Sequence, residues 1–516
     1  SCRKFDWDRI ESEYKKISSN LLDFLYFRSG LLNRAGDDYL TGAWHWSHVK
    51  RGGKAWFDDV TIEEDETRPF GPFTSSVYQD AAVDGLLTFT AVLNGTADSL
   101  GKGLTAALEY TDAKGRSAKR AATVGLRTVT APLDATALAK GRSPVRMALY
   151  DAAGNQLDKV ELTFTRPESL PKHRVELDRF GRTLLDGKLF FPLGMYSRKP
   201  ENQPDLDAYG RSPFNCLMPY CTPTRADLDL CHAKGILMMA CIKDLHFGSS
   251  HAPAFLKSRE DEEPCIRKVV NELKDHPALL AWYVNDEMSE DWIPRLDARR
   301  QLVRELDPGH PTWGVIYQVE SSHRYLNTCD VLGTDPYPVG SGADLDMPLR
   351  YSRTTVGNVF GSRGVWQVPQ AFDWGICNKT LKHPRFPTRD EMRSMAWQCV
   401  SAGANGLVFY SFSAMHTMRP GDTTSTFAKR WEDLTSVAEE IRKEFPTLLS
   451  EPGPKVRDVP AGMGARSWRL TGGSVRMLFV NATEKAVSGR VTFEDGTQQD
   501  VSLPAMGVTW AQKAVR

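Results

Sequence analysis

The middle of the chain, from about residue 175 to about residue 448, alternates segments typical of buried strands with segments typical of amphipathic helices. Such alternation indicates parallel β/α units. Eight strands are predicted, at 190–196, 215–219, 236–242, 279–284, 312–317, 331–334, 364–370 and 406–412. Helices are predicted between them, at 225–233, 262–274, 296–306 and 389–402. Eight units of this size match a (β/α)8 TIM barrel, whose active sites lie at the carboxyl ends of the strands.

Shorter strands flank this region on both sides. Residues 66–170 carry alternating runs separated by Gly and Asp turns, which predicts an immunoglobulin-like β-sandwich, with strands at 86–93, 104–110, 145–150 and 159–164. Residues 451–516 repeat the pattern, with strands predicted at 465–470, 475–480, 489–493 and 507–511 in a small C-terminal β-sandwich. Residues 1–65 are expected to form an accessory region, partly like a jelly roll, with a helix at 10–31 and strands at 43–47 and 54–62. The expected protein is therefore multidomain, with the TIM barrel at 171–450 flanked by β-sandwiches.

Charge and apolar patterning exclude several classes of partner. Lys plus Arg and Asp plus Glu each number 65, so the formal net charge is zero. This balance gives no electrostatic basis for binding nucleic acid or an anionic membrane. No apolar run approaches the roughly 18 residues of a membrane span. The expected partner is an oligosaccharide or glycan, and the oligomeric state stays open.

The nine cysteines contain no Cys-x-x-Cys pair, and eight of them lie in the barrel region. This distribution favours free, buried thiols over a disulfide scaffold or a zinc site, and we expect neither a metal nor a cofactor. The chain opens at Ser1-Cys2 without a signal peptide. Cys2 fits a lipoprotein acylation site or a trimmed start, and both stay open. We expect a secreted, periplasmic or cell-surface protein.

The predicted fourth barrel strand ends in Asn285-Asp286-Glu287. Adjacent carboxylates repel each other, and here the fold places both at the catalytic face. The alternative is that one of them caps the helix that begins near Ser289. The position favours a catalytic role for Asp286 and Glu287.

Motifs in four predicted strands resemble those of the clan A glycoside hydrolases. Residues 185–196, with Asp-Gly-Lys before Leu-Phe-Phe-Pro-Leu-Gly-Met-Tyr, resemble the clan's opening strand. Residues 276–287, His-Pro-Ala-Leu-Leu-Ala-Trp-Tyr-Val-Asn-Asp-Glu, resemble its fourth strand, whose last Glu is the acid/base. Residues 331–338 and 402–412 resemble its sixth and eighth strands. The resemblance spans the barrel and implies hydrolysis of a β-linked glycoside with Glu287 as proton donor.

The seventh strand departs from that family. Clan A enzymes carry a nucleophilic Glu at its end, where this chain has Gln370. An amide cannot serve as the nucleophile, and a retaining enzyme of the ordinary kind needs two carboxyl groups across the sugar. Asp373, three residues further on, is the acid available nearby. One hypothesis is therefore a β-galactosidase- or β-glucosidase-like enzyme with a displaced nucleophile such as Asp373, or an inverting variant.

The Asp286-Glu287 pair also resembles the pair in glycoside hydrolase families 20 and 123, which act on 2-acetamido sugars. There the substrate's own acetamido oxygen attacks the anomeric carbon, so no enzymic nucleophile is needed. The resemblance implies that Glu287 is the acid/base and that Asp286 orients the acetamido group. A third hypothesis is a carbohydrate-binding barrel that has lost catalysis.

Further residues near the predicted strand ends are candidates for substrate binding. For each of them, packing within the barrel is the competing explanation, and for His246, just beyond the third strand, a plain loop position is an equal one. The candidates are Asp244, Asp335, Tyr337, Gln370, Asp373, Trp374 and Tyr410.

Overall fold

The computed structural model describes residues 68–378, 380–381, 383–417 and 426–514, together with the backbone of two short strands before them. The chain divides into two compact units, Ser1–Arg68 and Pro69–Arg516. In the first unit, β1 (Gly30–Leu31) pairs antiparallel with β2 (Leu40–Thr41). The prediction of a helix at 10–31 is therefore wrong for Gly30 and Leu31, which form β1. Its remainder, and the strands predicted at 43–47 and 54–62, lie outside the described residues.

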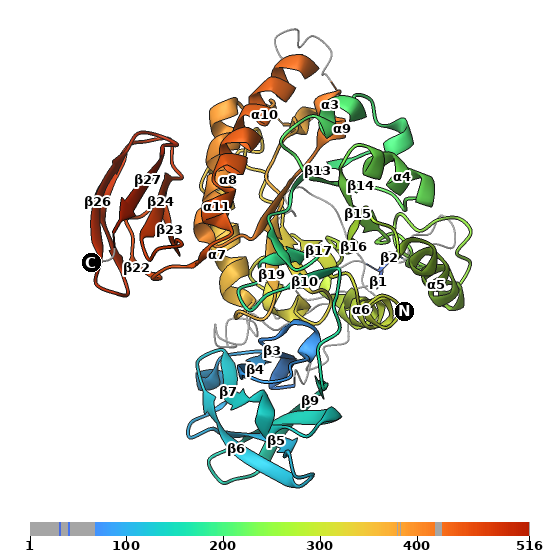
Figure 1. Cartoon of the computed structure of the whole chain (residues 1–516), viewed down its shortest axis with the longest axis vertical. Coiled ribbons are helices and arrows are strands. Elements are labelled where there is room, and N and C mark those ends of the chain that lie inside the picture. The colour runs from blue at the N-terminus through green and yellow to red at the C-terminus, as the bar shows by residue number, and fades with distance from the viewer. Residues whose placement is uncertain are drawn as a thin grey trace, which may run out of the picture. The chain divides into compact units, whose positions relative to one another are not determined.

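Eight parallel strands close into a barrel, as the sequence predicted (Figure 1). Every predicted barrel strand is present, and the fourth to the eighth begin at the predicted residues. The first begins later than predicted, because Lys188–Phe190 forms β12 of a small antiparallel sheet with β10 (Val175–Leu177) and β11 (Thr183–Leu185). The barrel strands are β13 (Leu193–Ser197), β14 (Cys216–Pro219), β15 (Leu237–Cys241), β16 (Leu279–Asp286), β17 (Thr312–Ile316), β18 (Val331–Thr334), β19 (Gly364–Gln367) and β20 (Gly406–Phe409).

Helices surround the barrel in the order expected of β/α units (Figure 1). Two of them begin at capping boxes, which Thr224 and Thr388 make at the predicted starts of α4 and α8. Among the described residues, no helix is both long and apolar enough to cross a bilayer. The helices are α3 (Leu206–Gly210), α4 (Arg225–Ala233), α5 (Glu262–Leu273), α6 (Ile293–Leu306), α7 (Met347–Asn358), α8 (Arg389–Ala402), α9 (Phe412–Met415), α10 (Phe427–Lys443) and α11 (Phe445–Leu448).

The barrel strands separate two apolar layers. Because successive side chains of a strand point to opposite faces, neighbouring residues enter different layers. Met195 packs in the outer layer, beneath the helices, whereas Tyr196 packs in the interior. Tyr283, Trp313 and Trp366 join Tyr196 in that interior and are fully buried or nearly so. Large aromatic rings therefore fill the barrel below its carboxyl-terminal rim.

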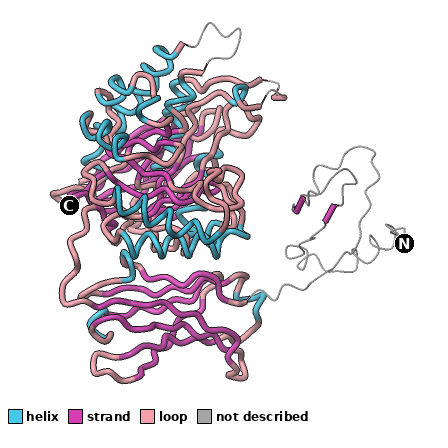
Figure 2. Tube along the Cα trace, turned by 90° about the vertical axis from the view of Figure 1, so that its right-hand side faces the viewer, coloured by secondary structure: helices cyan, strands magenta, loops and turns pink. Residues whose placement is uncertain are grey.

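A separate antiparallel sheet precedes the barrel (Figure 2). Its strand order is β3-β4-β7-β6-β5-β8-β9. The four predicted strands correspond to β4, β5, β8 and β9, and β3, β6 and β7 were not predicted. The sheet is continuous, because β6 pairs with β5 along most of its length and with β7 at its end. The strands are β3 (Phe70–Ser75), β4 (Leu86–Leu93), β5 (Thr105–Thr111), β6 (Ser117–Val124), β7 (Thr128–Asp134), β8 (Gly141–Tyr150) and β9 (Gln156–Arg166).

Two antiparallel sheets follow the barrel, and all four predicted strands are found in them, as β23, β24, β25 and β27. Trp468 and Trp510 pack toward α8, where the Trp510 ring lies 5.4 Å from that of Trp397. One sheet contains β21 (Glu451–Pro452), β23 (Met463–Arg469), β24 (Val475–Asn481) and β27 (Val508–Lys513). The other contains β22 (Val456–Asp458), β25 (Val487–Phe493) and β26 (Gln498–Leu503).

The eight cysteines from Cys216 to Cys399 are free. Five are buried, and burial raises the pKa of Cys329, for example, to about 11. Such thiols act as small apolar side chains, as the sequence indicated. Cys377 is exposed.

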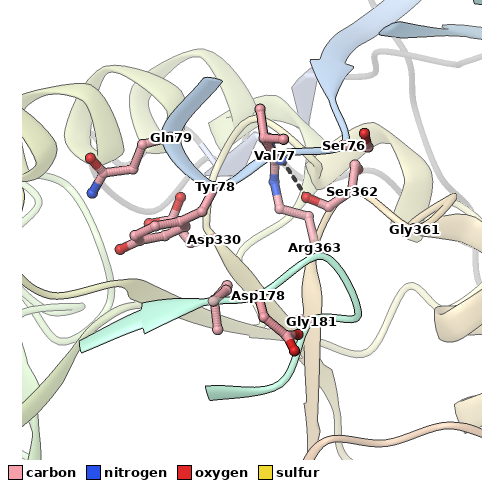
Figure 3. Close-up of a pocket in the computed structure, with 12 residues that line it drawn as sticks. Ser76, Val77, Tyr78, Gln79, Asp178, Gly181, Asp330, Gly361, Ser362 and Arg363 are labelled. Carbon is pink, nitrogen blue, oxygen red and sulfur yellow. Dashed lines mark hydrogen bonds between the residues drawn. The ribbon is translucent and has the colours of Figure 1, made fainter. Parts of the chain in front are cut away.

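A buried ion pair fixes the base of the barrel, where β18 begins. The Arg300 guanidinium donates to Asp330 Oδ1 at 2.6 Å, while the backbone N–H and hydroxyl of Thr312 donate to Oδ2 at 2.9 and 2.8 Å. Tyr78 and Arg363 line a cleft with Asp330 at this end (Figure 3). Burial alone would raise the pKa of Asp330, but the two arginines and the Thr312 N–H lower it to about 2. The pair thereby holds β17 and β18 in register at their amino ends.

Asp330→Asn is expected to destabilise the protein by about 3 kcal/mol, because it leaves Arg300 buried without its counter-charge. Since the pKa of Asp330 is lower in the folded state, its contribution is present above about pH 4 and is lost as the pH falls toward 2. Urea unfolding at neutral pH measures the cost. Asp112→Asn, which breaks the exposed pair with Arg116, is the control and should cost much less, because water screens that pair. An equal effect of the two substitutions would contradict this account of the base.

Candidate active site

Glu287 stands immediately after β16, at the carboxyl-terminal rim of the barrel. Asp286 is still in register with Val315 of β17, and the Glu287 N–H donates to the Val315 carbonyl at 2.9 Å. Glu287 then turns out of the strand with φ of 57°, a left-handed conformation that is uncommon for a residue other than glycine. Its side chain is exposed. Backbone strain of this kind concentrates at functional sites.

Asp286 is held by donors from three neighbouring strand ends. The Tyr283 hydroxyl donates to Oδ1 at 2.5 Å, and the Tyr220 hydroxyl donates to Oδ2. Lys243 Nζ lies 3.3 Å from Oδ2, 2.8 Å from Asp244 Oδ1 and 4.1 Å from the centre of the Tyr220 ring. These contacts fix one orientation of the carboxylate and leave its side chain 17% exposed.

Lys243 is the buried cation of this group, with a side chain only 3% exposed. Burial would lower its pKa, but the charge of Asp286 and the hydrogen bond to Asp244 outweigh burial and raise it. Lys243 therefore stays charged and neutralises part of the negative charge at the rim.

Asp335 follows β18, two strands away from Glu287 around the barrel. Its side chain keeps some exposure, but Oδ1 is buried and receives no hydrogen bond in the structure. Burial, a hydrogen bond with the Glu287 carboxyl and the charges of Glu287 and Asp286 raise the pKa of Asp335 well above its usual range. The rim therefore brings three carboxyl groups together, from the ends of β16 and β18.

Aromatic side chains form one wall beside these carboxyls. Tyr410, after β20, lies 5.1 Å from Tyr196, 5.8 Å from Tyr337 and 5.4 Å from Phe372, measured between ring centres. Trp374 lies 6.1 Å from Tyr337 and donates its indole N–H to the Tyr337 carbonyl. Burial and the charge of Asp286 raise the pKa of Tyr410 to about 12, so its hydroxyl stays protonated. The wall offers flat apolar faces and hydroxyl donors, both suited to a sugar ring.

The side chain of Gln370 is buried and hydrogen-bonded to backbone groups. It is fully buried, accepts from the Val339 N–H at 2.8 Å and donates to the carbonyls of Val339 and Phe372 at 2.8 and 3.1 Å. Both amide hydrogens are used. The expectation that Gln370 donates to a substrate is therefore corrected: its amide fixes the loops after β18 and β19.

Asp373 is also buried and not exposed at the rim. Its side chain is 1% exposed, and Oδ1 accepts from the Gly375 N–H at 2.8 Å, which caps η9 (Trp374–Ile376). A nucleophile must reach the anomeric carbon, and a buried capping carboxylate does not. The geometry therefore does not favour Asp373 as a displaced nucleophile.

His246 belongs to a buried network beside the third strand. It lies 3.2 Å from Arg299 and 3.3 Å from Glu262, and its ring packs against Trp292. Burial lowers its pKa to about 4. These contacts are those of a structural loop histidine.

The predicted residues that meet around the rim are Asp244, Asp286, Glu287, Asp335, Tyr337, Trp374 and Tyr410. Sequence reasoning missed Tyr196, Tyr220, Lys243 and Tyr283. Tyr220 and Lys243 are the first residues after the predicted strands 215–219 and 236–242. Testing every polar residue one position beyond a predicted strand would have found both. The same rule misses Tyr317, which is 53% exposed just after β17, because the predicted strand 312–317 includes it.

Comparisons with known proteins give distant likenesses. The structure is similar to a β-glucuronidase from an uncultured Clostridium species, with 13% identity over 72% of this chain and 68% of that chain, at a TM-score of 0.40. It is similar to a putative β-galactosidase from Bacteroides fragilis, with 10% identity over 83% and 72%, at a TM-score of 0.38. A Lactobacillus rhamnosus β-glucuronidase gives 13% identity over 72% and 68%, at a TM-score of 0.41. No family model and no curated protein matches the chain. Likenesses this distant carry no argument about chemistry, which must come from the site itself.

Gln370→Glu is expected to destabilise the protein by about 2–4 kcal/mol rather than to create a nucleophile. The carboxylate would face the carbonyls of Val339 and Phe372 with no N–H to donate. The cost should be larger at about pH 8 than at about pH 4, where a protonated Glu can still donate one hydrogen bond.

Urea unfolding at both pH values measures this cost. Gln498→Glu, on the exposed side of β26, is the control and should change stability by under about 0.5 kcal/mol. A stable Gln370→Glu protein with a functional carboxylate would contradict the structural role of Gln370.

Proposed function

We propose that this protein is a glycoside hydrolase that cleaves β-linked sugars, with Glu287 as the proton donor. The observation that carries the proposal is the position of Glu287. It is an exposed glutamate at the carboxyl-terminal rim of a closed parallel barrel, beside Asp286, Asp335 and an aromatic wall. Active sites of TIM-barrel enzymes occur on this face.

The chemistry needs a group that protonates the leaving oxygen while the anomeric carbon acquires positive charge. Glu287 is the carboxyl group of the three that is most open to solvent, so a glycosidic oxygen can reach it. Asp286 keeps its orientation through Tyr283, Tyr220 and Lys243. Its negative charge is placed to stabilise a cationic centre beside Glu287.

The finer part of the proposal concerns the nucleophile. Within the described residues, strand β19 and the loop after it supply Gln370 and Asp373, which are both buried and bonded to backbone groups. A substrate with a 2-acetamido group brings its own nucleophile, the acetamido oxygen, and needs one carboxylate to orient the acetamido N–H. Asp286 is adjacent to Glu287, rigidly held and partly exposed, which suits that role. We therefore propose a 2-acetamido sugar as the substrate and Asp286 as its orienting group.

Glu287→Gln is expected to lower kcat on a β-linked oligosaccharide by at least about a hundredfold, because the amide cannot supply the proton. The substitution preserves shape, so sugar binding measured by calorimetry should persist. Glu320→Gln, another exposed glutamate on the same side of the barrel, is the control and should leave kcat unchanged. Wild-type activity in Glu287→Gln would remove Glu287 from the mechanism.

A panel of aryl β-glycosides tests the substrate class. Substrates with the 2-acetamido group should be cleaved, and matched substrates with a 2-hydroxyl should not, since they lack the internal nucleophile. A thiazoline analogue of the cyclic intermediate should inhibit. Cleavage of 2-hydroxyl substrates at comparable rates would contradict substrate assistance and favour an enzymic nucleophile. Sugar binding without turnover of any substrate would instead identify a non-catalytic barrel.

A further inference from the structure

Glu287 and Asp335 stand at the same rim of the barrel, directly after β16 and β18. Asp286 is level with Val315, and Val315 is level with Gly333, so the end of β16 stands beside the end of β18 with one strand between them. Glu287 leaves the strand with φ of 57°, and its carboxyl lies close enough to Asp335 to interact with it electrostatically. Carboxyls that close cannot both be ionised without strong repulsion.

The surroundings decide which of the two carboxyls holds a proton. Asp335 Oδ1 is buried and accepts no hydrogen bond, whereas Glu287 is exposed to water. Other titratable groups that act on Asp335 are Asp286 at the end of β16, Tyr196 on β13 and Tyr337 after β18, with Tyr351 of α7 on the outer side. The tyrosines are neutral, because burial raises the pKa of each. Lys243 is already paired with Asp286 and Asp244.

We propose that Asp335 holds the proton that Glu287 delivers to the leaving oxygen, so that the two carboxyl groups share one proton. The inference rests on the proposed function and assigns Asp335 as a positioning residue that acts through Glu287. The proton passes from an Asp335 oxygen to Glu287 as the sugar binds. It then passes from Glu287 to the glycosidic oxygen while the bond from that oxygen to the anomeric carbon breaks. Water later supplies hydroxide to the anomeric carbon and returns one proton to the pair.

A raised pKa of Asp335 makes the stability of the folded protein depend on pH, which can be measured without any substrate. The pKa of Asp335 is higher in the folded protein than in the unfolded chain, so the folded state binds the proton more tightly. The stabilisation is fully present below the unfolded pKa of about 4 and is lost as the pH rises through the folded value. The contribution of this pair to stability should therefore fall as the pH rises from about 4 to about 8, and comparison of the wild type with a variant that lacks Asp335 isolates it.

Urea unfolding of Asp335→Asn, Glu287→Gln and the double variant tests the pair directly. The unfolding midpoint of the wild type, measured relative to that of each single variant, should fall between about pH 4 and about pH 8. The double variant should show the same pH dependence as Asp335→Asn. Asp344→Asn, on an exposed residue of the same loop, should behave as the wild type. A pH dependence in Asp335→Asn equal to that of the wild type would overturn the proposal.

The pH profile of kcat/KM then tests the role in catalysis. In Asp335→Asn the alkaline limb should move to lower pH by about one unit, which is about a tenfold loss at a fixed pH on that limb, with KM little changed. Asp335→Glu should restore part of the shift. A loss that is uniform across pH would show a merely structural role. If no glycoside is cleaved by the wild type, the proposed function fails, while the unfolding comparison still decides whether the pair shares a proton.

Discussion

Mutual repulsion among three carboxyl groups is the constraint around which the rim of this barrel is built. Asp286 and Glu287 are adjacent in the chain, and Asp335 meets Glu287 from a strand two positions away. The protein reduces their repulsion in two different ways. Asp286 is paired with Lys243 and accepts from two tyrosine hydroxyls, whereas Asp335 has a buried Oδ1 without a donor, which favours its neutral form. Unequal environments of this kind give neighbouring acids different pKa values and therefore different roles in catalysis.

The rest of the barrel maintains that difference. The aromatic rings of Tyr196, Tyr283 and Trp313 fill the interior beneath the rim and keep water away from the carboxyls from below. At the opposite end, Asp330 and Arg300 tie β17 to the start of β18, the strand that ends at Asp335. The position of the acid at the top therefore depends on buried charge at the base.

Much of the fold could be predicted from sequence, because buried strands and helices of a β/α barrel have different periods and clear capping residues. The predicted bounds 331–334, 225–233 and 389–402 match β18, α4 and α8. Prediction did less well in the preceding sheet, where β6 is mostly exposed and lacks an apolar stripe. At the site, position along a strand located Glu287, Asp286 and Asp335. It could not show that Gln370 is turned into the protein or that Asp373 caps a short helix, because those roles depend on backbone contacts from distant loops.

The leaving-group dependence of hydrolysis tests the role of Glu287 most directly. A proton donor matters most when the leaving oxygen is basic and least when it departs easily as an anion. The account predicts that Glu287→Gln loses far more rate on an alkyl or sugar leaving group than on a dinitrophenyl one. Equal losses on both would show that Glu287 does not protonate the leaving oxygen, and would contradict the account.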